Sequence, residues 1–190
     1  YLQCGGSEIK EFHYKINKHD WKGLIYLKRN NLMGSIFSLW DNKVVIIRGF
    51  PKIKYSHDSK VKEKLCYAEE KVDGSNIGIW AFPDGTIMGK TRMVERWDIG
   101  SKLAGEEGAW KKKFELVPET EAVYDLARKG YVIYCELYGY KNSGEFVKYS
   151  VPIAIKIIGI VDRSKYNFLT RKETEKLCKE FLLPLPNIHF

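Results

Sequence analysis

The sequence has few residues that could cross-link the chain or hold a structural metal ion. Its cysteines, Cys4, Cys66, Cys135 and Cys178, are widely scattered and form no C-x-x-C pair. Reduced thiols in an intracellular protein are therefore favoured over disulfides or a zinc site. Metal-ligand spacing is also missing from the histidines, which are His13, His19, His57 and His189. These absences argue against a disulfide-rich secreted domain, and the sequence identifies no residue as a metal ligand.

An apolar run long enough to cross a membrane, a signal-peptide pattern, internal repeats and low-complexity segments are absent as well. This predicts no membrane partner and an intracellular location, cytoplasmic or nuclear. The 190 residues are 44% hydrophobic and 14% aromatic, which is enough for one globular domain with a substantial core. The net charge of +8 favours polyanionic partners such as nucleic acid or nucleotides, although basic side chains often only face water. Nothing in the sequence indicates an oligomeric state.

Local patterns predict strands alternating with a few helices. Residues 1–42 are ambiguous, since the apolar residues around Trp21 fit either a packed hairpin or a short helix. Thr170 opens a capping-box helix to about Phe181, and Asp58 is placed to cap a short helix over 59–65. A further helix is expected over 118–129, and the strands are expected over 43–48, 65–70, 77–82, 86–92, 131–137 and 151–161.

The stretch Lys71-Val72-Asp73-Gly74-Ser75-Asn76 lies between two of these strands. A lysine at a strand end beside a tight Asp-Gly turn can act as a nucleophile on phosphorus, and Gly74 lets a ligand approach the backbone closely. A free lysine amine has a pKa of about 10.4 and is protonated at neutral pH. Such a nucleophile therefore needs neighbouring cations and partial desolvation. The alternative is an ordinary turn with a solvated lysine.

A hairpin supplies one candidate cation. Pro83-Asp84-Gly85 is a strong turn between alternating segments. If Phe82 lies opposite Ile87, the antiparallel ladder brings Arg92 back to Ile77, beside the Lys71 turn. Lys90 lies on the same face as Arg92 and is the substitute candidate.

Other charged segments allow two interpretations each. Arg48, Lys52 and Lys54 could line a phosphate site or form a basic loop facing water. Glu136 stands in an otherwise uncharged strand and could accept hydrogen bonds from a ribose or face outward. The segment 110–114 (WKKKF) could track a nucleic-acid backbone or form a solvated helix face with buried aromatic residues.

In this order, the motifs resemble those of the covalent nucleotidyltransferases, which comprise polynucleotide ligases and mRNA capping enzymes. The resemblance runs from about residue 48 to residue 162. Residues 69–76 (EEKVDGSN) are similar to the nucleophile motif of ATP-dependent RNA ligases. Asn76 stands where DNA ligases and capping enzymes often have arginine. The segments 89–92 (GKTR), 134–139 (YCELYG) and 48–52 (RGFPK) resemble the next basic motif, the ribose-contacting strand and a basic segment of phage single-strand repair RNA ligases.

This resemblance implies an α+β fold of mostly antiparallel sheets with flanking helices, a nucleotidyltransferase (ATP-grasp-like) ligase domain. It also implies that Lys71 attacks the α-phosphate of ATP and that the AMP then passes to a 5′-phosphate of RNA. A 3′-hydroxyl would then displace the AMP and seal the strand. Mg²⁺ would assist as a Lewis acid. The resemblance implies that Arg92, Arg48 and Lys52 contact the triphosphate and that Glu136 contacts the ribose. It also implies that Glu69 or the Glu70 backbone contacts the adenine edge.

The sequence also departs from this family. An aromatic residue that stacks on adenine is usual near residues 160–162, where this chain has Ile160 and Val161. The later motifs are missing, so we expect a single, C-terminally incomplete domain over 1–190, with an N-terminal extension at 1–42 and the core at 43–190. The rival interpretations are a DNA ligase or GTP-dependent capping enzyme, and a non-catalytic basic RNA-binding module.

Overall fold

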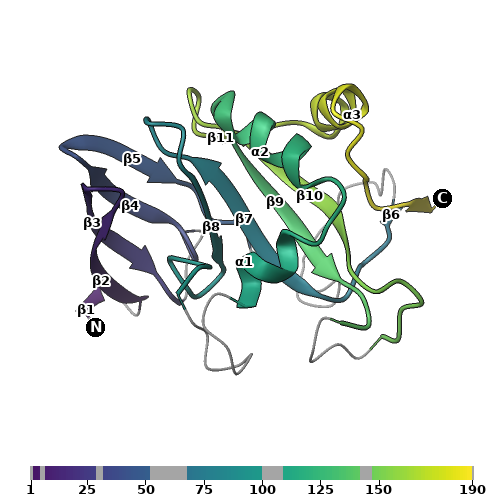
Figure 1. Cartoon of the computed structure of the whole chain (residues 1–190), viewed down its shortest axis with the longest axis horizontal. Coiled ribbons are helices and arrows are strands. Elements are labelled where there is room, and N and C mark those ends of the chain that lie inside the picture. Colours follow the sequence, from purple (N-terminus) through teal and green to yellow (C-terminus); the bar gives the residue numbers. More distant parts are fainter. Residues whose placement is uncertain are drawn as a thin grey trace, which may run out of the picture.

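The structure, a computed structural model, describes residues 2–4, 7–28, 32–51, 68–99, 109–141 and 147–189. Within these ranges the chain forms two five-stranded antiparallel sheets, one small two-stranded sheet and three helices (Figure 1). The α+β architecture expected from the sequence is therefore confirmed. None of the described helices is long and apolar enough to cross a membrane.

The first sheet is built from the segment that the sequence left ambiguous. It is a simple meander whose strands follow chain order: β1 (Leu2–Cys4), β2 (Ser7–Ile16), β3 (His19–Tyr26), β4 (Ile36–Trp40) and β5 (Lys43–Ile47). The hairpin alternative is thus the correct one. Both two-residue turns, Asn17-Lys18 and Asp41-Asn42, have positive φ angles, as type I′ hairpin turns require. The boundary expected between residues 42 and 43 falls inside the turn that joins β4 to β5.

The second sheet has the strand order β11-β10-β9-β7-β8. Its strands are β7 (Ser75–Ala81), β8 (Ile87–Thr91), β9 (Tyr131–Tyr138), β10 (Ala154–Asp162) and β11 (Asn167–Phe168). A short ladder pairs β6 (Ala68–Glu69), which precedes β7 in the chain, with β12 (Ile188–His189). The strands predicted around the hairpin and at 131–137 and 151–161 are therefore present, with small shifts at their ends.

The β7–β8 hairpin differs from the prediction by one position. Ile87 pairs with Ala81 rather than Phe82, so Ile77 pairs with Thr91 rather than Arg92. The reason is a shorter turn: the Phe82 N–H donates to the Thr86 carbonyl at 2.8 Å, so the three residues 83–85 form the loop instead of the four expected. Because side chains alternate between the two faces of a strand, this single shift moves Arg92 to the opposite face from the one that the predicted register gives.

Helices α1 (Ala109–Phe114) and α2 (Thr120–Arg128) lie over one face of the second sheet, whereas α3 (Arg171–Glu180) lies beside β10 (Figure 1). Thr170 and Glu173 form the expected capping box at the start of α3. Gly130, at φ +96°, ends α2 as expected. The helix expected over 59–65 lies outside the described residues.

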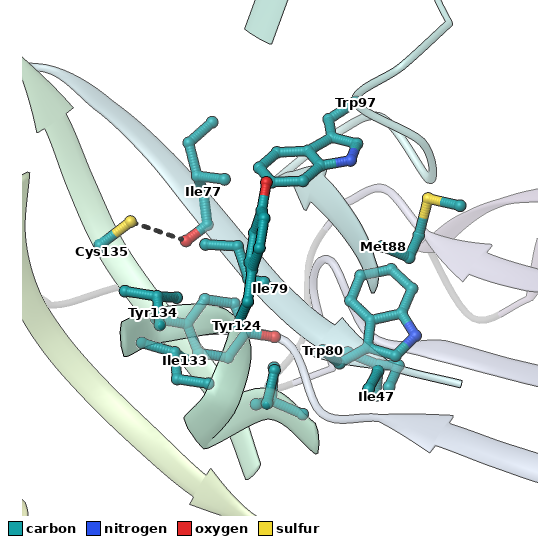
Figure 2. Packing of buried hydrophobic residues seen from close by; sticks show 14 of the residues in the cluster. Ile47, Ile77, Ile79, Trp80, Met88, Trp97, Tyr124, Ile133, Tyr134 and Cys135 are labelled. Carbon is teal, nitrogen blue, oxygen red and sulfur yellow. Dashed lines mark hydrogen bonds between the residues drawn. The ribbon is translucent and has the colours of Figure 1, made fainter. Parts of the chain in front are cut away.

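Two apolar layers hold the sheets in place. Between α2 and the second sheet, Ile77, Ile79 and Ile133 are fully buried (Figure 2). Between the two sheets, Trp40 of β4 stacks on Phe82 with ring centroids 3.9 Å apart. Both layers belong to one cluster of buried side chains.

The aromatic residues of the segment 110–114 take part in this packing. Phe114 is fully buried against Trp97, with a centroid distance of 5.3 Å, and the Lys113 ammonium lies 5.5 Å from the Trp110 ring centroid. The interpretation as a helix face with buried aromatics therefore fits better than the interpretation as a stacking surface for nucleic acid.

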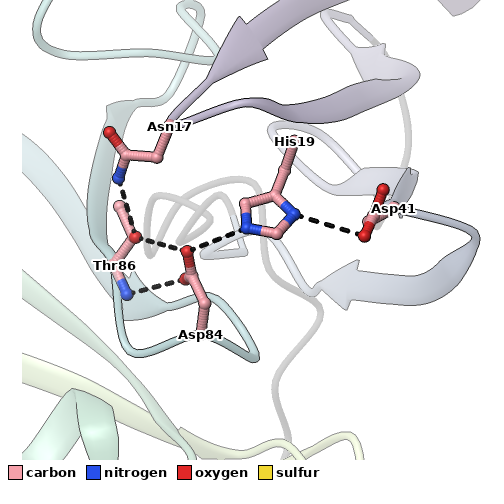
Figure 3. Close-up of polar contacts among 5 residues, drawn as sticks. All are labelled: Asn17, His19, Asp41, Asp84 and Thr86. Atoms are coloured by element: carbon pink, nitrogen blue, oxygen red, sulfur yellow. Dashed lines mark hydrogen bonds and ion pairs between the residues drawn. The ribbon is translucent and has the colours of Figure 1, made fainter.

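A polar cluster joins the turns of the two sheets (Figure 3). Asn17 Nδ2 donates to Thr86 Oγ1 at 3.0 Å. The His19 ring lies between Asp41, 3.2 Å from Nδ1, and Asp84, 3.7 Å from Nε2. These contacts tie the turn of the β7–β8 hairpin to the first sheet. The opposite end of the hairpin, which carries Arg92, lies at the candidate site.

Candidate active site

Lys71 lies in the connection between β6 and β7. Its side chain is exposed, whereas the next residue, Val72, is 7% exposed. The buried valine anchors the backbone at this point, so the amine of Lys71 is presented at the surface from a fixed segment.

The two glutamates before Lys71 are held by the C-terminal part of the chain. Glu69 forms an ion pair with Arg171 of α3. The Glu70 carboxylate accepts a hydrogen bond from Asn187 Nδ2 at 2.9 Å, and the Glu70 N–H donates to the Asn187 carbonyl at 2.8 Å. Both carboxylates therefore fasten the strand that precedes Lys71. The roles at the adenine edge suggested by the sequence resemblance stay predictions.

Glu136 of β9 lies beside the Lys71 turn. The Gly74 N–H lies near its carboxylate and favours the charged form. Burial raises the pKa of Glu136, whereas the Gly74 N–H and the charges of Lys71 and Arg92 oppose that rise. Lys71, Gly74, Arg92 and Glu136 are thus electrostatic neighbours, although they come from three separate segments.

The close approach of the turn to β9 depends on glycine. A Cβ atom at Gly74 would lie 2.3 Å from the Leu137 carbonyl oxygen, a distance that no side chain tolerates. Glycine therefore lets the turn meet β9 next to Glu136.

Arg92 follows the last pair of β8, on the same face as Asn76 and Glu136. Its Nε is buried and has no hydrogen-bond partner among the described residues. Lys90, the substitute candidate, is 1% exposed, and its ammonium donates to the Thr91 carbonyl at 3.1 Å. Burial, followed by the charge of Arg92, lowers the pKa of Lys90 to about 7. Arg92, which is only partly buried, is the better placed of the two to meet a ligand.

The first sheet holds the segment after Arg92. Glu95 is 1% exposed, and its Oε1 accepts hydrogen bonds from Lys10 Nζ at 2.7 Å and from the Tyr14 hydroxyl. Both donors belong to β2. Burial, followed by the hydrogen bond to Glu95 and its negative charge, raises the pKa of Tyr14. Sequence reasoning missed this contact because Lys10 and Glu95 are distant in the chain.

The upstream basic segment is only partly described, since Lys52 and Lys54 lie outside the described residues. Arg48 Nη1 donates to the Tyr166 carbonyl at 3.1 Å and to Asn167 Oδ1 at 3.2 Å. These contacts hold Arg48 at the turn between β10 and β11, and its role at the triphosphate stays a prediction.

Aromatic rings meet on the second sheet near the expected position. Ile160 and Val161 are buried, but Phe50 and Phe168 meet in an edge-on contact with centroids 5.7 Å apart. A Cβ at Gly159 would lie 2.9 Å from the Phe50 ring, so this glycine makes room for the rings on β10. Phe50, which follows the first sheet, thus brings an aromatic ring to this part of the fold.

Two polar residues lie opposite Glu136 in the sheet, and the sequence alone suggested no role at the site for either of them. In the ladders of the second sheet, Glu136 pairs with Asn76 on one side and Lys156 on the other, and directly opposed side chains have Cβ atoms about 5 Å apart. Lys156 is the single lysine in the apolar run 151–161, and this was the sequence signal that could have identified it. Among the described residues, no group of three or more His, Cys, Asp or Glu side chains could hold a metal ion.

These residues combine an exposed amine, a guanidinium and a partly buried carboxylate around a glycine turn. Two antiparallel sheets with flanking helices are the architecture of the nucleotidyltransferase ligase fold. The structure resembles two forms of an archaeal ATP-dependent RNA ligase, with TM-scores of 0.70 and 0.69 at 19% and 20% identity. It also resembles a putative ATP-dependent DNA ligase from Aquifex aeolicus, with a TM-score of 0.63 at 16% identity.

The model of the RNA ligase family matches residues 64–189, more than half of the chain, and the chain belongs to this family. Of the three solved structures, the matches cover 95%, 94% and 95% of this chain. They cover 47%, 47% and 46% of the other chains, so this chain spans about half their length. No curated protein sequence matches it.

Proposed function

We propose that this protein is an ATP-dependent RNA ligase that joins 5′-phosphate and 3′-hydroxyl RNA ends. One observation carries the proposal: the Glu136 carboxylate lies within the electrostatic reach of Lys71 and Arg92, next to the Gly74 N–H. An amine, a cation and a carboxylate at one glycine turn are the groups that nucleotide transfer through a lysine requires.

In the first step, the deprotonated Lys71 amine attacks the α-phosphorus of ATP. A P–N bond forms and the nitrogen gives up a proton, the bond from the α-phosphorus to the bridging oxygen breaks, and pyrophosphate leaves. In the second step, an RNA 5′-phosphate oxygen attacks the same phosphorus, and the P–N bond breaks as the amine regains a proton. In the third step, a 3′-hydroxyl loses its proton, attacks the RNA 5′-phosphorus and expels AMP.

The residues of the site support separate parts of this sequence. The Arg92 guanidinium would neutralise the triphosphate, since its Nε has no hydrogen-bond partner among the described residues. Glu136 would accept hydrogen bonds from the ribose. Arg48 and Lys52 remain proposed phosphate contacts, and Glu69 or the Glu70 backbone remains the proposed contact to the adenine edge.

ATP would bring Mg²⁺ with it. Mg²⁺ commonly takes most of its ligands from substrate phosphates and water, with one or two carboxylates from the protein. The described residues contain no larger cluster of ligands, which fits such a phosphate-bound ion. It would reduce the charge repulsion at the α-phosphorus and on the departing pyrophosphate.

The test is to incubate the protein with α-labelled ATP or GTP and Mg²⁺ and to measure acid-labile label on the protein. We expect label from ATP, none in Lys71→Ala, and normal labelling in the matched control Lys43→Ala, whose lysine is exposed on β5. Label from GTP alone would indicate a capping enzyme. No label from either nucleotide would overturn the proposal and favour a non-catalytic RNA-binding module.

The substrate needs a separate measurement, because the fold is also similar to that of a putative DNA ligase. We expect sealing of single-stranded or nicked RNA and weaker sealing of nicked DNA. A preference for nicked DNA would contradict the assignment to RNA. An intracellular site of action, where such ends arise, remains part of the proposal.

A further inference from the structure

A tyrosine- and lysine-rich surface adjoins the turn after Lys71. The chain beyond β9 and the chain before β10 run side by side there: the Tyr140 N–H donates to the Val151 carbonyl at 3.0 Å and the Lys141 N–H to the Pro152 carbonyl at 2.9 Å. In Figure 1 this green segment lies next to the start of β7. It is the outer end of the hairpin that carries Glu136.

Direct contacts attach this segment to the nucleophile turn. The Asp73 N–H donates to the Tyr149 hydroxyl oxygen at 2.8 Å, and the Val147 N–H donates to Asp73 Oδ2 at 3.3 Å. The Tyr149 ring in turn meets the Tyr138 ring edge-on, with centroids 4.7 Å apart. The surface is therefore fixed relative to Lys71, two residues before Asp73.

The exposed side chains of this segment are aromatic and cationic. Tyr140 is 63% exposed, and both Lys141 and Lys148 are exposed. Within the described residues 138–141 and 147–153 there is no carboxylate. Lys141 and Lys148 therefore offer positive charge to a polyanion on this side of Lys71.

We propose that Tyr140, Lys141 and Lys148 bind the 5′-terminal nucleotides of the RNA strand that receives AMP. This inference rests on the proposed function. In the transfer step, the 5′-phosphate must come within bonding distance of the phosphorus on Lys71, so the next nucleotides lie on the surface that adjoins it. An exposed aromatic ring offers stacking to an unpaired base, and lysines neutralise the phosphates beside it.

The test separates AMP transfer from lysine adenylylation. Wild type, Tyr140→Ala and the double variant Lys141→Ala/Lys148→Ala are first adenylylated with ATP and then mixed with increasing 5′-phosphorylated single-stranded RNA. We expect normal adenylylation in all three. The RNA concentration for half-maximal AMP transfer should rise about tenfold for Tyr140→Ala, as loss of one stacking contact implies. The matched control is Tyr166→Ala, since Tyr166 is 48% exposed at another place.

Normal adenylylation with an unchanged RNA dependence in Tyr140→Ala and in the double variant would overturn the inference. If wild type forms no lysyl-AMP, the proposed function fails instead, and binding of the same RNA by fluorescence anisotropy still decides the inference. Weaker binding by these variants than by wild type and Tyr166→Ala supports the surface. Equal RNA binding by all of these proteins refutes the inference. This includes the case in which the surface binds a protein partner instead of RNA.

Discussion

The buried ammonium of Lys90 predicts an unusual dependence of stability on pH. Lys90 lies directly before the end of β8, and burial lowers its pKa from 10.5 to about 7. At about 1.4 kcal/mol per pKa unit, keeping this group protonated inside the fold costs about 5 kcal/mol at pH values below 7. Methionine has a similar length, no charge and an adaptable shape, so Lys90→Met removes this cost.

The sign follows from proton binding. Between pH 7 and pH 10.5 the unfolded chain keeps the Lys90 proton, whereas the folded chain has lost it. The unfolding free energy of wild type therefore rises with pH in this window, by up to about 1.4 kcal/mol per pH unit. Relative to Lys90→Met, wild type should gain about 2 kcal/mol between pH 7 and pH 9.

The assay is urea unfolding of wild type and Lys90→Met from pH 6 to pH 10, extrapolated linearly to water. Comparison of the two proteins cancels the other titrating groups. The control is Lys43→Met, which replaces an exposed lysine and should follow wild type at every pH. A difference between wild type and Lys90→Met that stays constant with pH would refute the buried, titrating lysine.

Three further variants test the supports of the site. Glu136→Gln should raise the melting temperature at pH 7, because burial raises the pKa of Glu136 and the fold is less stable with this acid ionised. The gain should vanish at pH values below the pKa that Glu136 has in the unfolded chain. The same variant should slow adenylylation about tenfold or more through a lost charged hydrogen bond. Arg171→Ala releases Glu69 and should raise the KM for ATP in adenylylation several-fold, with partial recovery in Arg171→Lys and less than about 1 kcal/mol lost in stability. Glu95→Ala removes the buried partner of Lys10 and Tyr14 and should lower the unfolding free energy in urea by about 1 to 2 kcal/mol, since Lys10 is 40% exposed and regains water; an unchanged unfolding free energy would contradict a structural role for Glu95.

Elements with local signals could be predicted from the sequence. The capping box at Thr170 and the end of α2 at Gly130 are set by residues a few positions apart, so the pattern alone identified them. The strand carrying Glu136 was identified for the same reason, since its β-branched and aromatic residues are contiguous. The Lys71 motif is likewise a continuous stretch, and its role as the nucleophile stays a prediction.

Pairings between distant residues could not be predicted. The partners of Glu69 and Glu95, Arg171 and Lys10, lie far away in the chain, and no local pattern identifies such pairs. The predicted hairpin register was wrong by one position because the number of residues in the turn depends on its own hydrogen bonds. That position decides on which face of the sheet Arg92 lies, so the neighbourhood of Arg92 and Glu136 was expected but its geometry was not.

The most direct test of the central claim is to locate the nucleotide on the protein. After incubation with ATP and Mg²⁺, peptides from the protein are analysed by mass spectrometry for the mass of one AMP. We expect AMP on the peptide containing Lys71, on the Lys71 amine itself, and its release when 5′-phosphorylated RNA is added. AMP on another residue, or no modified peptide at all, would contradict the central claim.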